Sequence, residues 1–428
     1  MASEWRTVKL SDLGEVNRGR SRHRPRYAEH LYGGPYPFIQ TGDIKNADGH
    51  LTTYQQTYSE AGLAQGRLWP AGTMCITIAA NIAETAILDF PACFPDSVVG
   101  FIADPSKCDV RFVEYMFRHM RGGIQHEASG SVQDNINLAT LERLRFPLPP
   151  LSEQRRIADI LAALDDKIEL NRRMSQTLES MARALFNSWF VDFDPVRAKA
   201  EGRDLGLPPR LAALFPDSFE NSELGEVPRG WHAARLSDLV TLNPSRALAQ
   251  GSESPYLDMA NMPTSGHTPL DITIRPFSSG SRFVNGDTLM ARITPCLENG
   301  KTAFVDFLPD GAVGWGSTEF LVLRTKPPLP PEFAYCLARS EAFRDFAING
   351  MTGSSGRQRV SADSLAEYPV AQPSDEIATL FGRQASLLLT KARYAHLEGS
   401  ALSMQREALL PVLMANRHAS HHPGGGHE

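Results

Sequence analysis

The sequence has few cysteines and no apolar run long enough to cross a membrane. Its five cysteines lie far apart and form no Cys-x-x-Cys pair, so neither a disulfide framework nor a zinc site is predicted. No segment reaches the roughly 18 uninterrupted apolar residues of a transmembrane helix. The first residues lack the basic start and apolar core of a secretory signal, so we expect a cytoplasmic protein.

Motifs of known enzyme chemistry are also missing. The chain has no Gly-x-Gly-x-x-Gly after a strand, no Gly-x-x-x-x-Gly-Lys phosphate loop, no His-Glu-x-x-His and no Gly-x-Ser-x-Gly. The Gly/Ser-rich stretch from Thr352 to Arg357 lacks the lysine that such a phosphate loop needs. We therefore predict a protein that binds and does not catalyse. The alternative is a self-contained enzyme with an unrecognised active site.

The chain is acidic overall but carries one dense run of arginines. Its formal net charge is -6 at pH 7. Residues 18–26 place Arg18, Arg20, Arg22, Arg24 and Arg26 at alternate positions, with no acidic residue between them. A local patch sets the electrostatic field at a contact site whatever the net charge is. The run predicts a loop that contacts phosphates, and the alternative is a solvated basic loop.

One phrase of the sequence occurs twice with the same spacing. The chain reads Trp5-x-x-x-Lys9-Leu10-Ser11-Asp12-Leu13-x-x-x-Asn17, and later Trp231-x-x-x-Arg235-Leu236-Ser237-Asp238-Leu239-x-x-x-Asn243. A match of this kind rarely arises by chance, so it predicts two copies of one structural unit. A globular stretch, a proline-punctuated turn and a long segment of helical periodicity follow each copy.

The organisation along the chain follows this repeat. Residues 1–150 mix β-rich runs at 37–39, 74–78 and 98–102 with a helical stretch near 112–120, and residues 228–373 have the same α+β composition. Prolines close both domains, since they interrupt helices and central strands. Residues 191–227 form a connector with a helical turn expected at 210–214, and the His/Gly-rich tail at 416–428 is expected to be disordered.

Two long helices are predicted, at 151–190 and 374–415. Apolar residues recur there in alternating steps of four and three, the heptad pattern of pairing helices, and Asn171 and Ser175 are polar positions in the first seam. A helix this long, roughly 57 Å at 1.5 Å per residue, cannot bury its apolar stripe alone. We predict antiparallel pairing about a pseudo-two-fold axis; the alternative is two helices that pack separately on their own domains. The predicted pairing residues are Ile157, Leu161, Leu164, Ile168, Leu178, Leu185, Ile377, Phe381, Leu388, Leu402 and Leu409.

The expected fold class is therefore α+β, with two similar globular domains separated by two long antiparallel helices. Corresponding loops of the two domains carry residue types that read base edges, because Arg pairs with guanine, Asn or Gln with adenine, and Ser or Thr with either. For any one of them the alternative is an ordinary surface turn. In the first domain these residues are Gln40, Thr41, Asn81, Ser131, Gln133 and Asn135. In the second they are Ser245, Arg246, Asn261, Arg292, Thr294, Asn299, Lys301, Ser355, Arg357, Gln358 and Arg359.

The whole pattern resembles the specificity subunit of type I restriction–modification enzymes. Besides the repeated opening phrase, the resemblance is carried by Pro-Leu-Pro-Pro-Leu-Ser-Glu-Gln-Arg-Arg-Ile at 147–157, Trp-Phe-Val-Asp-Phe-Asp-Pro-Val at 189–196 and Leu-Gly-Glu-Val-Pro-Arg-Gly-Trp at 224–231. The second copy departs from the family pattern at 373–377, where the Gln-Arg-Arg run is missing.

The resemblance implies a non-catalytic subunit with two target-recognition domains, each reading one half of a split double-stranded DNA site. The paired helices would set the gap between the halves and dock two methyltransferase subunits, whose cofactor is S-adenosylmethionine. A motor–nuclease subunit using ATP and Mg²⁺ would join them. The resemblance places none of these cofactors on this chain. The alternatives are a self-contained restriction or methylation enzyme with an unrecognised active site, and a scaffold without a nucleic-acid role.

Overall fold

The computed structural model describes residues 5–23, 25, 27–129, 136 and 138–415. The predicted disordered tail lies outside the described residues. The chain divides into two compact units, residues 1–168 with 400–428, and residues 169–399. None of the helices in the described part combines the length and the apolar character needed to span a lipid bilayer.

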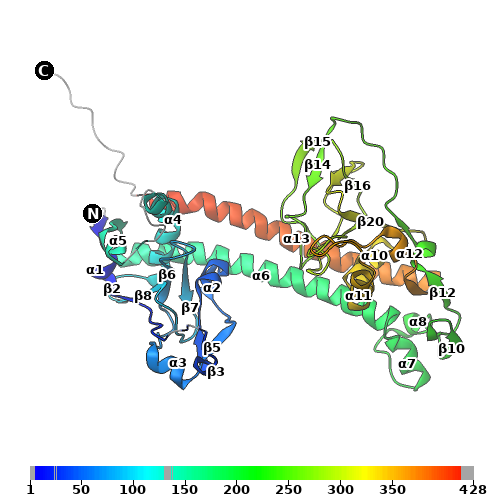
Figure 1. The fold of residues 1–428 in the computed structure, drawn as a ribbon, viewed down its shortest axis with the longest axis horizontal. Coiled ribbons are helices and arrows are strands. Elements are labelled where there is room, and N and C mark those ends of the chain that lie inside the picture. Colours follow the sequence, from blue (N-terminus) through cyan, green and yellow to red (C-terminus); the bar gives the residue numbers. More distant parts are fainter. Residues whose placement is uncertain (1–4, 24, 26, 130–135, 137, 416–428) are drawn as a thin grey trace. The chain divides into compact units, whose positions relative to one another are not determined.

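The first unit contains a mixed five-stranded sheet and its helices (Figure 1). The strand order is β2 (Gly14–Arg18), β8 (Val98–Ala103), β6 (Met74–Thr77), β7 (Thr85–Leu88) and β4 (Gly49–Leu51). Two further pairs are β1 (Arg6–Val8) with β9 (Phe146–Leu148), and β3 (Tyr32–Phe38) with β5 (Gln56–Tyr58). The helices are α1 (Leu10–Leu13), the 3₁₀ turn η1 (Glu29–Leu31), α2 (Thr41–Asn46), α3 (Glu60–Gln65), α4 (Val110–Ser129) and α5 (Leu138–Arg143).

The central strands of this sheet are apolar because both of their faces are covered. Every residue of β6 and β7 is buried. Met74 and Ile76 belong to one apolar cluster with Phe112 of α4, whereas Cys75 belongs to a second cluster with Trp69. Successive side chains of a strand point to opposite faces, so these two clusters lie on the two sides of the sheet. This explains why the run at 74–78 is largely apolar and does not alternate with exposed residues.

The second unit contains two four-stranded sheets. One has the order β13 (Val240–Leu242), β20 (Phe320–Thr325), β17 (Thr288–Ala291), β18 (Thr302–Phe304), and the other β15 (Thr273–Pro276), β14 (Glu253–Leu257), β19 (Gly314–Gly316), β16 (Ser281–Phe283). Strand β12 (His232–Arg235) pairs with β21 (Pro369–Gln372). The helices of the domain are α9 (Leu236–Leu239), α10 (Pro331–Arg339), α11 (Glu341–Asn349) and α12 (Ala362–Ala366). The connector forms α7 (Asp194–Ala200), α8 (Pro209–Ala212) and the hairpin β10 (Phe219–Ser222) with β11 (Gly225–Pro228).

The two domains share one framework. In the first, β2 pairs with β8, β8 with β6, and β6 with β7, all antiparallel; in the second, β13, β20, β17 and β18 pair in the same succession and sense. Each domain is also closed by a short antiparallel pair that joins its first strand to its last, β1 with β9 and β12 with β21. The repeated Leu-Ser-Asp-Leu phrase forms α1 and α9. The predicted α+β fold with two similar domains is confirmed.

Two helices of 40 residues each follow the domains, α6 (Leu151–Phe190) and α13 (Asp375–Met414). In the first unit, Ile157 and Leu161 of α6 share an apolar core with Met414 of α13. In the second unit, Phe186 of α6 lies against Phe381 of α13, with ring centroids 6.0 Å apart. Within the first unit Asp165 also meets Arg406, and within the second Asn171 meets Glu398. In each unit a later residue of α6 thus meets an earlier residue of α13, so the segments pair antiparallel. The alternative of two separately packed helices is not what the structure shows.

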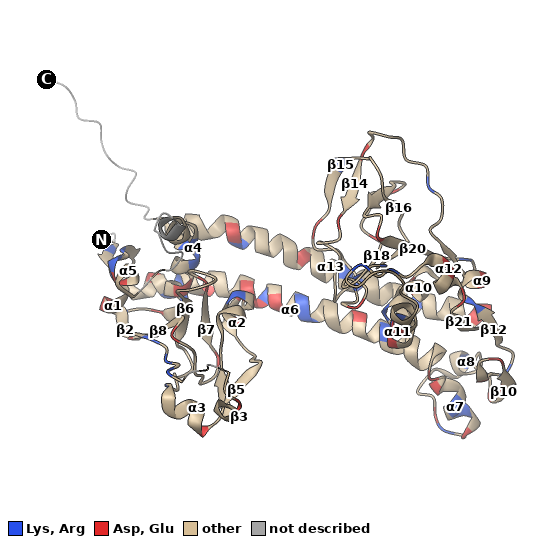
Figure 2. Cartoon of the chain, in the orientation of Figure 1, with Lys and Arg blue, Asp and Glu red and all other residues tan. Residues whose placement is uncertain are grey.

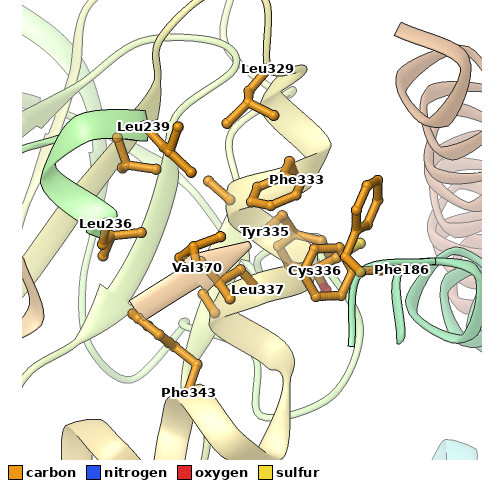
Figure 3. Close-up of a cluster of buried hydrophobic side chains, with 14 of the residues drawn as sticks. Phe186, Leu236, Leu239, Leu329, Phe333, Tyr335, Cys336, Leu337, Phe343 and Val370 are labelled. Atoms are coloured by element: carbon orange, nitrogen blue, oxygen red, sulfur yellow. The ribbon is translucent and has the colours of Figure 1, made fainter. Parts of the chain in front are cut away.

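The second core is built where these helices meet the domain. Phe186 also contacts Phe333 of α10, with ring centroids 5.1 Å apart, and Cys336 and Val370 belong to the same cluster (Figure 3). Val196 and Phe215 of the connector are buried in this cluster as well. The connector is therefore part of the second unit's core and not a loose linker.

The predicted pairing residues fit α6 better than α13. Ile157 and Leu161 are buried, and Leu164, Ile168, Leu178 and Leu185 are half-buried. In α13, Ile377 and Phe381 are buried and Leu388 and Leu402 half-buried, but Leu409 is 38% exposed, so its assignment to the seam is wrong. A strict seven-residue repeat drifts by about 20° per heptad against the 3.6-residue turn. After four heptads the buried side has moved on by almost one residue, to Leu410 and Met414.

Asn171 is a fully buried polar residue in the seam of α6. Its exposed fraction is 0%, its side-chain nitrogen donates to Glu398 of α13 at 3.0 Å, and its side-chain oxygen has no partner among the described residues. An unsatisfied buried acceptor lowers stability, while a polar seam position can select one register of pairing.

We expect Asn171→Leu to raise the free energy of unfolding by about 1 kcal/mol, because the unsatisfied amide oxygen is removed from the core. Thermal unfolding of the full chain measures this. The control is Thr177→Leu, at an exposed position of the same helix, which should change little. A lower melting temperature for Asn171→Leu would contradict this interpretation.

Candidate nucleic-acid interface

In the first domain, hydrogen bonds bring three loops together at one end of the sheet. The amide of Ile78, just after β6, donates to the carbonyl of Ser97 before β8 at 3.0 Å. The amide of Ile136, in the segment before α5, donates to the carbonyl of Ile78 at 3.2 Å. Asn81 lies in the same β6–β7 loop and is half-buried. The β6–β7 loop, which carries Asn81, therefore lies beside Ser97 and Ile136 at this end of the sheet.

The second domain repeats this arrangement with different residues. The amide of Arg292, after β17, donates to the carbonyl of Glu319 before β20 at 2.9 Å, and the amide of Val360, before α12, donates to the carbonyl of Arg292 at 3.0 Å. Arg292, Glu319 and Val360 thus take the places of Ile78, Ser97 and Ile136. We define these two loop clusters as the candidate interface of each domain.

The arginine run of the first domain starts at this interface. Arg18 ends β2, and its Nε donates to the carbonyl oxygen of Asp96. Arg20 and Arg22 are exposed. The other predicted residues Arg24, Arg26, Ser131, Gln133 and Asn135 lie outside the described residues.

Gln40 and Thr41 lie at the start of α2. The Gln40 side-chain nitrogen donates to Gln56 at 2.6 Å, and Thr41 is half-buried. The preceding residue, Ile39, donates its amide to the carbonyl of Cys93 at 2.8 Å, while the amide of Arg20 donates to the carbonyl of Phe94 at 3.2 Å. Cys93 and Phe94 are adjacent in the sequence, so Gln40 lies close to the arginine run.

Three predicted cations of the second domain are bonded inside it. Arg246 donates to Asp287, a fully buried carboxylate whose burial raises its pKa while Arg246 and Arg324 favour the charged form. The ammonium of Lys301 donates to the carbonyl oxygen of Met259 at 2.5 Å. These contacts stabilise the loops, because a buried charge or carbonyl left without a partner is costly.

Arg359 is the third of these cations. Its Nε and Nη2 donate to the two carboxylate oxygens of Glu319 at 2.7 to 3.0 Å, an arrangement that lowers the pKa of Glu319. A bidentate pair of this kind holds both side chains in place. Arg246, Lys301 and Arg359 thus hold the loops in place through contacts inside the domain.

The remaining predicted residues of the second domain are distributed over its loops. Ser245 and Arg292 line a common cavity of about 300 Å³. The amide of Thr294 donates to the carbonyl of half-buried Gln358 at 3.1 Å. Asn261 is half-buried, and the exposed residues are Asn299, Ser355 and Arg357.

Sequence reasoning missed Arg339, a buried arginine of α10. Its guanidinium donates to the carbonyl oxygens of Thr264 at 2.8 Å, Gly300 at 2.9 Å and Thr302 at 2.8 Å, and to that of Gly266. These carbonyls belong to the loops that carry Asn261, Asn299 and Lys301. No local motif marks Arg339, because its partners are far away in the sequence.

Arg339 belongs to a buried polar network that reaches α6. The hydroxyl of Tyr335 donates to Glu179 of α6 at 2.6 Å, and Arg339 lies 4.0 Å from the same carboxylate. Burial raises the pKa of Tyr335 well above its ordinary value, so the hydroxyl stays protonated and donates. The loops of the second domain are thus connected to the long helix through α10.

The first unit contains a comparable network. The hydroxyl of Tyr115 in α4 donates to Asp165 of α6 at 2.6 Å, and Arg406 of α13 donates to the same carboxylate at 2.5 Å. Arg406 also contacts Asp48, between α2 and β4, at 3.0 Å. In both units a tyrosine of the domain's helix binds a carboxylate of α6, with an arginine nearby.

The comparisons with known proteins agree with this geometry. Residues 2–180 match the sequence model of the type I restriction modification DNA specificity domain. The type I restriction enzyme MjaIX specificity subunit of Methanocaldococcus jannaschii is 27% identical over 272 residues, which cover 61% of this chain and 56% of that protein. The HindI specificity subunit of Haemophilus influenzae is 26% identical over 348 residues, which cover 67% of this chain and 72% of that protein.

A solved structure shows the same fold over nearly the whole chain. The crystal structure of a type I restriction–modification S subunit from M. genitalium aligns with a TM-score of 0.58 and 16% identity over 96% of both chains. The chain is therefore similar to the specificity subunits of type I restriction–modification systems, as the sequence resemblance predicted.

We expect Arg339→Ala to destabilise the second unit by about 3 kcal/mol or more, because four backbone carbonyls and Glu179 lose their buried cation. Thermal unfolding of the full chain measures the loss. Tyr335→Phe, which removes one hydroxyl, should cost about 1 kcal/mol. The control is Arg383→Ala at an exposed position of α13. Equal melting temperatures for Arg339→Ala and Arg383→Ala would contradict the role of Arg339.

Proposed function

We propose that this chain is the non-catalytic subunit that gives a restriction–modification complex its DNA specificity, with each domain reading one half of a split target. The observation that carries the proposal is the pair of equivalent loop clusters, one in each domain. Their backbone hydrogen bonds correspond, while their side chains differ. One framework with two sets of loops is what recognition of two unlike half-sites requires.

The distribution of charge supports DNA as the ligand despite the net charge of -6. In the first domain the exposed Arg20 and Arg22 follow Arg18 in a segment without acidic residues, which begins at the interface. In the second domain Arg282 and Arg292 line the cavity at the corresponding place. Along α6, by contrast, basic and acidic residues are interspersed (Figure 2). The acidic Glu319 of the second cluster is bonded to Arg359. Basic groups at a contact surface favour the binding of phosphates.

The long helices would dock the methyltransferase subunits and set the gap between the half-sites. In the second unit, both helices expose large apolar side chains, which are Leu170, Met174 and Met181 of α6, and Leu387, Tyr394 and Leu397 of α13, with exposed fractions from 41% to 68%. Their spacing of three, four and seven residues places those of each helix along one side. Apolar side chains repeated in this way are typical of a helix that receives a partner.

In this proposal the reactions belong to other subunits. The methyltransferase subunits would hold S-adenosylmethionine, and a motor–nuclease subunit would use ATP and Mg²⁺. This chain supplies the DNA-reading loops and the helices on which the subunits assemble. The split target itself is found by mapping methylated adenines across the genome of a host that carries the system.

We expect DNA binding by the full chain to weaken steeply with salt, because contacts to phosphates release counterions. Replacing both Arg20 and Arg22 by Ala should reduce the slope of log affinity against log salt by about 1 to 2, as about 0.9 is lost per phosphate contact. Fluorescence anisotropy with duplex DNA measures the slope. Replacing Arg210 and Arg229, exposed arginines outside the two loop clusters, should leave it unchanged. An unchanged slope for the first variant would remove the basic loop from the interface.

Replacing Leu387 and Tyr394 by Ser should weaken binding of the methyltransferase subunit by about 100-fold, because two apolar anchors of the docking face are lost. Isothermal titration of the full chain with that subunit measures the affinity. The control replaces Arg383 and Thr390, exposed polar residues of the same helix, by Ser. Equal affinities for the two variants would place the docking surface elsewhere.

A further inference from the structure

A polar cavity of about 300 Å³ opens at the interface of the second domain. It lies where the end of β13, the start of β16, the end of β17 and the start of β20 meet. Two of its lining residues, Ser245 and Arg292, were predicted from the sequence, and the lining also includes Asn243, Arg282 and Thr318, which were not. Four separate segments of the chain contribute, so the site exists only in the folded domain.

Arg292 is a cation of this cavity that forms no close ion pair with a carboxylate. Its only carboxylate neighbour among the described residues is Glu319, at 4.0 Å, and the Nε atom of Arg292 is buried without a hydrogen-bond partner there. Glu319 is itself bonded to Arg359 through both oxygens, at 2.7 to 3.0 Å. Arg359 therefore neutralises the acid and leaves Arg292 available to a ligand.

The lining of the cavity carries two positive charges. Arg282 and Arg292 have guanidinium groups, which only donate. The side-chain oxygen of Asn243 is occupied, because it accepts from the amide of Val322 at 3.0 Å. Ser245 adds a hydroxyl group. Two guanidinium groups fit an anion with several oxygens, such as a phosphate. The same donors also match the O6 and N7 acceptors of guanine, so a test must separate a phosphate contact from a base contact.

The first domain places an arginine at the corresponding position of its fold. Ser97 and Glu319 occupy equivalent places before β8 and β20, so Asp96 corresponds to Thr318 of the cavity. Arg18 reaches the carbonyl of Asp96 from β2, and its terminal amino groups add donors there. Both domains thus place a guanidinium group at the same end of the shared sheet. In the first domain it comes from the end of β2, and in the second from the residue after β17.

We propose that this position binds a phosphate of the DNA backbone in both domains, through Arg282 and Arg292 in the second and Arg18 in the first. The inference rests on the proposed function and assigns these residues to holding the DNA, not to reading its bases. The neighbouring loops, which differ between the domains, would then read the sequence at a fixed distance from an anchored phosphate.

The test compares Arg292→Gln and Arg292→Lys in the full chain assembled with its methyltransferase subunits. Affinity is measured over a range of salt concentrations for duplexes that carry the mapped target and for unrelated duplexes of the same length. Arg292→Gln should weaken binding to both DNAs by about tenfold and lower the salt slope by about 0.9. Arg292→Lys keeps the charge, so its salt slope should equal that of the wild type. Arg18→Gln should behave like Arg292→Gln.

The matched control is Arg235→Gln, an exposed arginine of the second domain outside the cavity, which should change neither quantity. Weaker binding of Arg292→Gln to the target alone would identify a base contact and overturn the proposal, as would unchanged binding to both DNAs. If all variants melt at the wild-type temperature, unfolding is excluded as the cause. If Arg292→Gln melts at a lower temperature, the same comparison is made with Arg282→Gln. A wild type that binds no DNA would overturn the proposed function as well.

Discussion

A helix of 40 residues with an apolar stripe cannot remain stable in water without a partner, and this constraint shapes both units of the protein. In each unit a segment of α6 pairs with a segment of α13, and the domain completes the core on the same pair. Ile157 and Met414 share the core of the first unit, and Phe186 and Phe381 that of the second. A domain and its helix segments therefore share one apolar core in each unit, and the packing of the helices supports the domain that carries the loops.

Buried polar groups add specificity to this apolar attachment. Tyr335 and Arg339 meet Glu179, while Tyr115 and Arg406 meet Asp165. Burying charges costs free energy, which is recovered only when the partners and the geometry are right. Such contacts contribute little net stability compared with apolar packing, but they disfavour any other placement of the domain on its helices. In the second unit the same network fixes the loops of the interface through Arg339.

Several cations of the candidate interface have partners inside the domain. Arg246, Lys301 and Arg359 are used inside the second domain, where they bind Asp287, a backbone carbonyl and Glu319. Arginine and lysine residues in a loop of a DNA-binding protein are therefore not equivalent, and their partners decide which of them can reach a ligand. These contacts make the loops rigid, and rigid loops present their remaining side chains in a defined geometry.

The repeated Trp and Leu-Ser-Asp-Leu phrase, the proline-rich turns and the heptad pattern were enough to determine two similar α+β domains and two long helices, because these features act within one segment. They were not enough to determine the side of α13 that is buried at Leu409, the cavity of Arg282 and Arg292, or the internal role of Arg359. Each of these depends on contacts between residues far apart in the sequence. Only the tertiary structure decides them, since burial and charge pairing are properties of the assembled fold and not of the local chain.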